Sequence, residues 1–184
     1  MEHKGTVILE TPRLILRPYR LEDAEAMYRN WASDEAVTEY LTWPPHESIA
    51  VTKTLLELWT GEYAREDRYN WTLELKGLGE PVGALDVVGI QESIGEATLG
   101  WCLGSPWWGQ GLMPEAAQAV LRFLFREVGF RRIAAQHDLD NPKSGRVMEK
   151  IGMRREGIRR KGGRNRRGIV DLVCYAILAE EFEG

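Results

Sequence analysis

The sequence is poor in the residues that hold metal ions. It has only two cysteines and three histidines among 184 residues. Cys102 and Cys174 lie in separate apolar segments and form no metal-binding spacing. We therefore expect two buried, free thiols in a reducing cytoplasm. The scattered histidines provide no zinc constellation, which argues against a metalloenzyme.

Long apolar runs are lacking as well. No segment approaches the length needed to cross a membrane, and the first six residues lack the apolar core of a signal peptide. We expect a cytoplasmic protein without membrane association. The 43% hydrophobic and 28% charged fractions are ordinary for a globular protein. A length of 184 residues suits one domain.

Charge is distributed unevenly along the chain. Residues 1–100 carry a net charge of −9, and residues 101–184 carry +5. The basic half would suit an anionic ligand, and the acidic half could attract a cationic acceptor. Solvated surface charge is the alternative for most individual residues.

Apolar periodicity predicts a mixed α/β domain without repeats or linkers. The expected helices cover residues 21–31, 34–40, 48–63, 114–128 and 141–151, with Asp34 and Ser48 as N-caps of the second and third. The expected strands cover residues 13–17, 70–75, 81–88, 98–103, 132–137, 153–159 and 169–178. Residues 162–168 would form the tip of the closing hairpin. This order leaves no room for a second domain.

One glycine-containing loop carries the strongest local signal. The apolar run Leu99–Leu103 ends in a turn, Gly109 and Gly111 follow, and a helical segment begins at Pro114. Glycines let a backbone approach a ligand closely, and the first N–H groups of a helix lack helical partners. The arrangement therefore predicts a phosphate cradle, with Glu115 complementing the helix dipole. A simple tight turn is the alternative, because glycine spacing alone is a weak signal.

Five groups of residues, in order along the chain, carry a family resemblance. They are Leu9–Pro18, Trp43–His46, Trp108–Ala116, Asn141–Ser144 with Glu149–Met153, and Glu156–Gly157 with Asp171–Tyr175. Together they resemble the GNAT superfamily of N-acetyltransferases, and more narrowly its ribosomal-protein-alanine N-acetyltransferase (Rim-type) branch. The resemblance implies one N-acetyltransferase domain over residues 9–181. Its α/β fold would have a single mixed, mostly antiparallel sheet, flanked by helices and with splayed central strands.

The resemblance also implies a ligand, acetyl-CoA, as co-substrate. The loop that begins at Trp108 would bind its pyrophosphate through the backbone N–H groups of Gly109, Gln110, Gly111, Leu112 and Met113. Met113 is bulkier than the small residue of the family. The pantetheine arm would lie between the strand ending at Cys102 and Leu103 and the strand near His137. An N–H near Leu103 would polarise the thioester carbonyl.

Two polar residues take part in the reaction that the resemblance implies. Ser144 would protonate the leaving thiolate, and Asn141 would hold an amide of the cofactor. Helix capping is the alternative for both side chains, because Asn and Ser favour that position.

The group that accepts the proton of the attacking amine is less well defined. Some members of the branch carry a hairpin glutamate, but Arg159–Arg164 contains no carboxylate. Asp86 is the first candidate, because it lies in an otherwise apolar strand where burial would raise its pKa. The alternative is that Asp86 is a structural residue at an edge of the sheet or at a β-bulge. Glu39 and Glu96 are weaker candidates, and a water relay remains open for an α-amine with a pKa of about 7.7 to 8.0.

The acceptor is expected to be a primary amine. A protein N-terminal α-amine, as in a ribosomal protein, is favoured over a small amine such as an antibiotic, polyamine or amino acid. An open cleft would accept a chain terminus, and a closed acidic pocket would accept a polyamine. Aromatic residues could line a slot for the acceptor, with core packing as the alternative: Tyr40, Trp43, Trp101, Trp107 and Trp108. The protein would be a monomer or a homodimer.

A hypothesis of a different class is an RNA-binding or ribosome-associated module. The closing hairpin carries eight basic residues, Arg154, Arg155, Arg159, Arg160, Lys161, Arg164, Arg166 and Arg167. Such charge density can bind phosphates nonspecifically, but it lacks the interleaved aromatics that stack on bases. We therefore predict a surface hairpin that docks near a ribosome or holds the 3′-phosphate of CoA.

Overall fold

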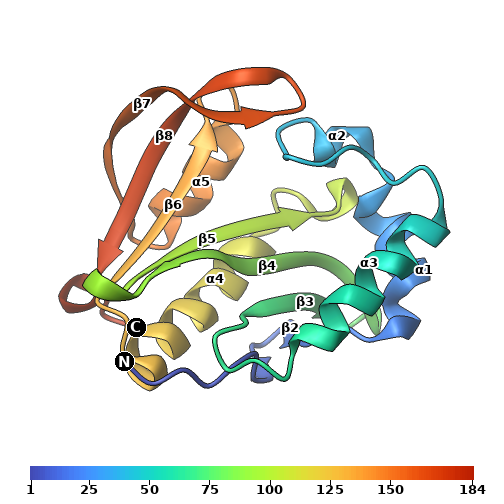
Figure 1. Cartoon of the computed structure of the whole chain (residues 1–184), viewed down its shortest axis with the longest axis horizontal. Coiled ribbons are helices and arrows are strands. Elements are labelled where there is room, and N and C mark those ends of the chain that lie inside the picture. Colours follow the sequence, from blue (N-terminus) through green and yellow to red (C-terminus); the bar gives the residue numbers. More distant parts are fainter.

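Eight strands form one continuous sheet in this computed structural model, which describes all residues from Met1 to Gly184 (Figure 1). The strands are β1 (Leu9–Glu10), β2 (Leu14–Arg17), β3 (Asn70–Leu75), β4 (Glu80–Gln91), β5 (Glu96–Leu103), β6 (Arg132–Asp138), β7 (Arg154–Asn165) and β8 (Gly168–Leu178). Their order across the sheet is β1-β2-β3-β4-β5-β6-β8-β7. All neighbours are antiparallel except β5 and β6. The expected mixed, mostly antiparallel sheet is confirmed.

Helices cover both faces of this sheet. They are α1 (Ala24–Met27), α2 (Glu35–Thr38), α3 (Ile49–Glu62), α4 (Leu112–Phe123) and α5 (Pro142–Lys150). Helices α4 and α5 lie on one face, here called the rear face, and α1 and α3 lie on the opposite, front face (Figure 1). None of the helices combines the length and apolar character required for a membrane span.

The rear face carries the main hydrophobic core. Trp71, Leu85 and Leu99 come from three neighbouring strands and are almost completely buried there. Helix α4 meets them with apolar residues spaced three and four positions apart, such as Ala117, Val120 and Leu121, which form one stripe of the helix. Each large side chain buried in this way contributes about 1.5 to 3 kcal/mol. This packing fixes the position of α4, and thus of the loop that precedes it.

The front face has a smaller core under α1 and α3, centred on Trp31 and Leu56. A buried ion-pair network lies beside it. Arg17 is only 4% exposed, donates to both carboxylate oxygens of Asp23 at 2.8 Å and reaches Glu74 at 2.7 Å. Paired and hydrogen-bonded charges of this kind can remain buried. The network ties the N-terminal helices to β2 and β3.

The first predicted helix, over residues 21–31, is divided into three parts. A 3₁₀ turn at Leu21–Asp23 leads into α1, and a π-helical turn follows at Tyr28–Ala32. The Asp23 carboxylate accepts a bond from the Arg20 N–H, and Asn30 donates to the carbonyl of Pro81. Such side-chain bonds compete with the regular helical pattern. Periodicity alone does not reveal them.

Other boundaries differ by smaller amounts. Asp34 caps α2 as expected, accepting from the Ala36 N–H at 2.8 Å, whereas Ser48 precedes α3 without a side-chain cap bond. Helix α4 begins at Leu112, two residues before the expected start. The hairpin tip is shorter than predicted, because pairing of β7 with β8 continues to Asn165 and Gly168.

The two central strands β5 and β6 diverge, as the resemblance implied. Their parallel pairing ends at Leu99 and Ala135. Beyond this point β5 continues along β4 to Leu103, and β6 continues along β8 to Asp138. The facing edges of β5 and β6 therefore no longer bond to each other. Free strand edges of this kind can bind an extended ligand through backbone groups.

Candidate active site

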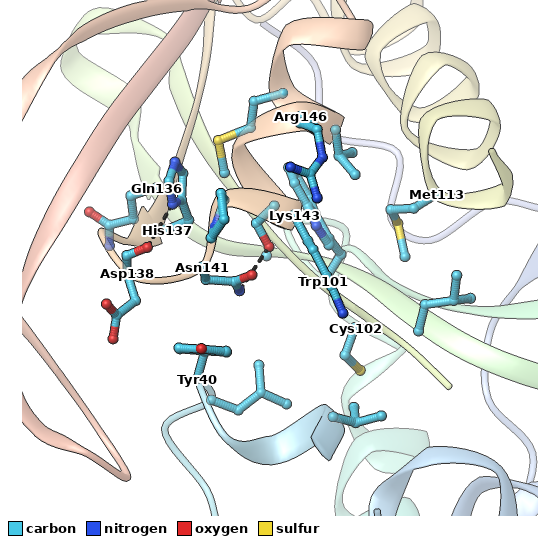
Figure 2. A pocket seen from close by; sticks show the side chains of 18 of the residues that line it. Tyr40, Trp101, Cys102, Met113, Gln136, His137, Asp138, Asn141, Lys143 and Arg146 are labelled. Atoms are coloured by element: carbon cyan, nitrogen blue, oxygen red, sulfur yellow. Dashed lines mark hydrogen bonds between the residues drawn. The ribbon is translucent and has the colours of Figure 1, made fainter. Parts of the chain in front are cut away.

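A large cavity lies where β5 and β6 diverge (Figure 2). Its volume is about 960 Å³. The ends of both strands, the glycine loop and the start of α5 line one part of it. The segment after α2, Glu39–Thr42, and the β7–β8 hairpin line the other. Side chains from segments far apart in the sequence, among them Tyr40, Trp101 and Lys143, thus surround one space (Figure 2).

The loop before α4 leaves several backbone N–H groups without helical partners. Gly109 and Gly111 have φ angles of 75° and 76°, a region that favours glycine. The first bond of α4 runs from the Glu115 N–H to the Gly111 carbonyl at 3.2 Å, so the N–H groups of Leu112 and Met113 have no helical acceptor. A Cβ atom at Gly109 would meet nothing within 4 Å. The loop is therefore an open anion cradle at a helix N-terminus.

The start of the sheet holds this loop in place. Glu115 accepts bonds from Thr11 Oγ1 at 2.6 Å, from the Arg13 N–H at 2.9 Å and from Arg13 Nε at 2.6 Å. Burial opposes the ionisation of Glu115, but these bonds lower its pKa overall. Arg13 also donates to the carbonyl of Gln110 at 2.8 Å. The Gln110 side chain itself turns away from the cavity and donates to Pro106.

The end of β5 directs one N–H group towards the gap. Gly104 donates to the carbonyl of Val82 at 2.8 Å, and alternation along an antiparallel strand turns the Leu103 N–H to the other side. Trp108 Nε1 donates to the Leu103 carbonyl at 2.6 Å. Lys143 Nζ lies 4.1 Å from the centroid of the Trp108 ring, a cation–π contact from α5 to the loop.

Asn141 and Ser144 meet at the start of α5. Asn141 Nδ2 donates to Ser144 Oγ at 3.2 Å, and both residues line the cavity. Asn141 occupies the N-cap position but makes no side-chain cap bond, so helix capping does not account for it. Because Ser144 Oγ accepts this bond, its own proton is free for another acceptor.

Asp86 lies on the front face of β4, beside the cavity but outside its lining. Its partner on β5, Gly100, does line the cavity. Asn70, which is 1% exposed, donates to Asp86 Oδ1 at 3.0 Å and accepts from Arg68 Nη2 at 2.7 Å. Burial raises the pKa of Asp86 to about 7, against the opposing charge of Arg68. This half-buried carboxyl group therefore titrates near neutral pH. It occupies a central strand, not an edge.

A thiol and a phenol lie near Asp86. Burial raises the pKa of Cys102 to about 12, and the charge of Asp86 adds to this effect. Burial likewise raises the pKa of Tyr19, again with help from Asp86, and the buried Tyr19 hydroxyl has no hydrogen-bond partner. Cys102 therefore remains a thiol at neutral pH. Both Cys102 and Cys174 are free, as expected, but they are only half-buried.

Comparison with known proteins identifies the family of this chain. Residues 13–154 match the family described as acetyltransferase (GNAT) domain. The chain belongs to the GNAT acetyltransferase family. It is therefore an acetyl-CoA-dependent N-acetyltransferase, and the resemblance seen in its motifs is confirmed.

Two relatives of this acetyltransferase match nearly its whole length, and a third matches about a third of it. The uncharacterized N-acetyltransferase YnaD of Bacillus subtilis is 30% identical, covering 95% of this chain and 98% of its own. The crystal structure of a GNAT-family acetyltransferase from Bacillus anthracis has a TM-score of 0.83 at 30% identity, covering 95% of this chain and all of that one. The [ribosomal protein uS5]-alanine N-acetyltransferase of Escherichia coli is 34% identical over 68 residues, 37% of this chain and 35% of that protein.

The site of this acetyltransferase fits acetyl-CoA. The open cradle suits a pyrophosphate, and the gap between β5 and β6 suits an extended arm. Three cations of α5, Lys143, Arg146 and Lys150, line the same cavity. The Met113 side chain is buried in the main core and also lines the cavity (Figure 2).

The hairpin tip of the acetyltransferase is bound to its own chain, beside α2 (Figure 1). Arg166 Nη1 donates to Thr38 Oγ1 at 2.9 Å, and Arg167 Nη2 donates to Asp140 at 2.8 Å. Asn165 Nδ2 donates to the buried Asp138 at 2.6 Å. Arg154 also forms an ion pair, with Glu181 at 2.9 Å. Three of the eight basic residues of the predicted patch are thus engaged by other segments of the protein, which reduces the charge available to an RNA.

Some of the remaining candidate residues from the sequence line the cavity, and others lie outside it. Glu39 lines the cavity, whereas Glu96 forms an ion pair with Arg132 at 2.5 Å outside its lining. Four of the five aromatic residues line the cavity, namely Tyr40, Trp101, Trp107 and Trp108. Trp43 instead packs on the front-face core and against His46, with ring centroids 5.3 Å apart.

Three residues of the site were not found in the sequence. Arg13 supports the loop from a position 97 residues away from Gln110, so no local spacing marks it. Arg68 precedes the predicted strand over residues 70–75 and Asn70 is its first residue, so both look like ordinary residues at the end of a turn. The polar Asn70 at the start of β3 is a weak signal, because its burial only becomes apparent in the folded sheet.

Proposed function

We propose that this acetyltransferase acts on the α-amino group at the N-terminus of a protein chain. The observation that carries this proposal is the charge of the cavity lining. Arg167 forms ion pairs with both Asp138, at 3.6 Å, and Asp140, at 2.8 Å, which leaves Glu39 as the one lining carboxylate without such a partner. A polyamine or an aminoglycoside carries several positive charges and requires an acidic pocket. The lining suits an acceptor with a single amine better.

The front face of the sheet offers an approach for a chain end. Val88 is 65% exposed, and Thr98, Gly100 and Cys102 are only partly buried on the same face. Helices α1 and α3 lie to one side of this region (Figure 1). A peptide can therefore reach the end of β5 along the sheet. The alanine N-acetyltransferase of a ribosomal protein among the relatives supports this acceptor class.

Backbone and side-chain groups of the cavity have separate roles in acetyl transfer. The N–H groups from Gly109 to Met113 bind the pyrophosphate of acetyl-CoA, and Asn141 accepts a bond from one of its amides. The Leu103 N–H donates to the thioester oxygen and stabilises the negative charge that develops there. Ser144 donates its proton to the sulfur as the carbon–sulfur bond breaks, and recovers a proton from water.

Asp86 receives the proton of the acceptor amine through a water molecule. An N-terminal ammonium has a pKa of about 7.7 to 8.0, and burial gives Asp86 a pKa of about 7. The proton therefore moves between two groups of similar pKa. The freed amine attacks the carbonyl carbon directly. As the carbon–sulfur bond breaks, the nitrogen loses a second proton to water, which offsets the proton that Ser144 recovers from water. Cys102 takes no part as a nucleophile, because its raised pKa keeps it protonated.

We assign the catalytic domain to residues 9–181. The first strand starts at Leu9, and the last 3₁₀ turn ends at Glu181.

We also propose a cytoplasmic location, because two free, half-buried thiols suit a reducing compartment.

A thiol-release assay with acetyl-CoA tests the acceptor class. We expect turnover with a peptide that has a free N-terminus and none with the same peptide blocked at its N-terminus. Spermidine and an aminoglycoside should react far more slowly. Ser144→Ala should lower kcat about 100-fold while acetyl-CoA still binds, because general acids contribute roughly 10²- to 10⁴-fold. Faster turnover of spermidine than of the peptide would disprove the chain-terminus assignment.

RNA binding is tested with the same preparations. We expect Gly111→Asp, which places a carboxylate in the phosphate cradle, to abolish thiol release. A salt-dependent shift of RNA in a gel that persists in this variant would instead support the binding module.

A further inference from the structure

A bulge in β7 positions Arg159 on the cavity wall. Arg159 pairs with Leu172 of β8, but the next pair is Gly163 with Val170, so three residues of β7 face a single residue of β8. Within the bulge, Lys161 adopts a left-handed backbone with φ of 48°, and its N–H donates to Asp171 Oδ1 at 2.7 Å. Bulges often redirect a side chain beside a functional site.

The guanidinium group of Arg159 is held in place but keeps most of its donors. Nη2 donates to the Gly162 carbonyl at 2.6 Å, and the side chain lies so close to Gly162 that a Cβ atom there would overlap it. One of five N–H groups is used, so the others can bind a carboxylate in a bidentate manner. Arg159 and Arg164 both line the cavity, and neither forms an ion pair within the protein.

The register of the sheet places Arg159 on the acceptor side. Directly paired residues of neighbouring antiparallel strands point to the same face. Arg159 pairs with Leu172, and Leu172 pairs with Asp138 of β6. Asp138 shares its face with Ala134, whose partner Thr98 lies on the front face of β5 with Gly100. The cations of α5, in contrast, come from the rear face, where the pyrophosphate cradle lies.

We infer that Arg159 binds a carboxylate of the acceptor, with Arg164 adding to the positive potential. The preferred acceptor is then a protein chain whose second residue is acidic, so that its N-terminal amine and a side-chain carboxylate lie a few ångströms apart. This inference rests on the proposed function, because it specifies which chain termini the cavity selects. Arg159 is exposed, so its guanidinium group is accessible to a carboxylate. Its fixed position limits the conformational freedom that is lost on binding.

This inference is tested with two peptides that differ only in their second residue, which is aspartate in one and asparagine in the other. With acetyl-CoA and the wild-type protein, we expect a KM about tenfold lower for the aspartate peptide, since charge-assisted hydrogen bonds are worth this factor or more. Arg159→Gln should remove the preference by raising the KM of the aspartate peptide alone. Gly162→Ala, which displaces the Arg159 side chain, should have the same effect, and Arg159→Lys should restore part of it.

Arg160→Gln is the matched control, because Arg160 carries the same charge in the same bulge and does not line the cavity. We expect it to keep the preference. Equal KM values for the two peptides in the wild type would overturn the inference while leaving the proposed function intact. A raised KM for acetyl-CoA in Arg159→Gln would also overturn it, since Arg159 would then bind the donor. If both peptides are inert and free aspartate is acetylated with the same dependence on Arg159, the proposed function fails and carboxylate binding stands.

Discussion

Asp86 shows how the surroundings of one residue can change its pKa. An exposed aspartate has a pKa near 3.9 and is too weak a base to take a proton from an ammonium group at neutral pH. Burial brings the pKa of Asp86 to about 7, with Arg68 opposing the shift. Asn70 fixes the carboxyl group and separates it from the guanidinium group of Arg68. The balance of these two effects determines the pH at which Asp86 can act.

The pH dependence of kcat/KM should report this balance. A base must be ionised to accept a proton, so we expect the rate to fall below about pH 7, the pKa of Asp86. Asp86→Asn should lower the rate at pH 7 about 100-fold or more. Arg68→Gln removes the charge that lowers the pKa of Asp86 and should therefore move the acid limb to higher pH. An unchanged profile in Asp86→Asn would favour a water relay without this base.

Stability gives a readout of Asp86 that does not depend on activity. The pKa is higher in the folded than in the unfolded protein, so protonation favours folding, and this contribution is lost as pH rises through about 7. The loss begins at the unfolded pKa of about 3.9, because above it the unfolded aspartate is ionised while the folded one stays neutral up to about pH 7. Asp86→Asn should therefore melt at a slightly higher temperature than the wild type at pH 5, and this difference should grow by pH 8.5.

At the scale of elements, the glycine loop depends on contacts from outside its own segment. Helix α4 supplies the N-terminus, but Thr11 and Arg13 at the start of the sheet fix the loop through Glu115 and Gln110. The loop is thus preorganised before a ligand arrives. Preorganisation favours binding because less conformational freedom is lost.

Glu115→Gln should weaken this support without unfolding the protein. The substitution keeps the shape but removes the charge that attracts Arg13, and a charge-assisted bond is worth about 1 kcal/mol more than a neutral one. We expect the KM for acetyl-CoA to rise about fivefold, with little change for the acceptor. Glu127→Gln, an exposed residue near the other end of the same helical segment, is the control. Equal effects of the two substitutions would contradict a specific role for Glu115.

At the scale of the whole molecule, the diverging strands divide the sheet into two parts that a ligand can join. Strands β1–β5 carry the glycine loop, and β6–β8 carry α5 and the hairpin. They are connected by contacts such as Lys143 with Trp108 in the cavity and Arg166 with Thr38 beside it. An extended ligand between β5 and β6 would replace the missing sheet bonds.

Acetyl-CoA should therefore stabilise the entire fold. At 100 times Kd, ligand binding adds about 2.7 kcal/mol to the free energy of unfolding, which corresponds to a rise in Tm of about 5 to 10 °C for a chain of this size. Ser144→Ala should keep this shift, because its proposed role is in proton transfer. Gly111→Asp should lose it. An equal shift in Gly111→Asp would place the ligand elsewhere.

The sequence by itself determined the order of elements, the fold class, the glycine loop and the family. These follow from local signals: apolar periodicity, the spacing of glycines and motifs whose residues lie close together in the chain. The tertiary structure decided the site around them. In the folded protein Asp86 lies beside Asn70 and Arg68, and Arg13 binds the glycine loop. Arg166 and Arg167, which look like part of a free basic patch in the sequence, contact α2 and the turn Asp138–Asp140. Burial, pKa and ion pairing depend on neighbours from distant segments, and only folding brings these together.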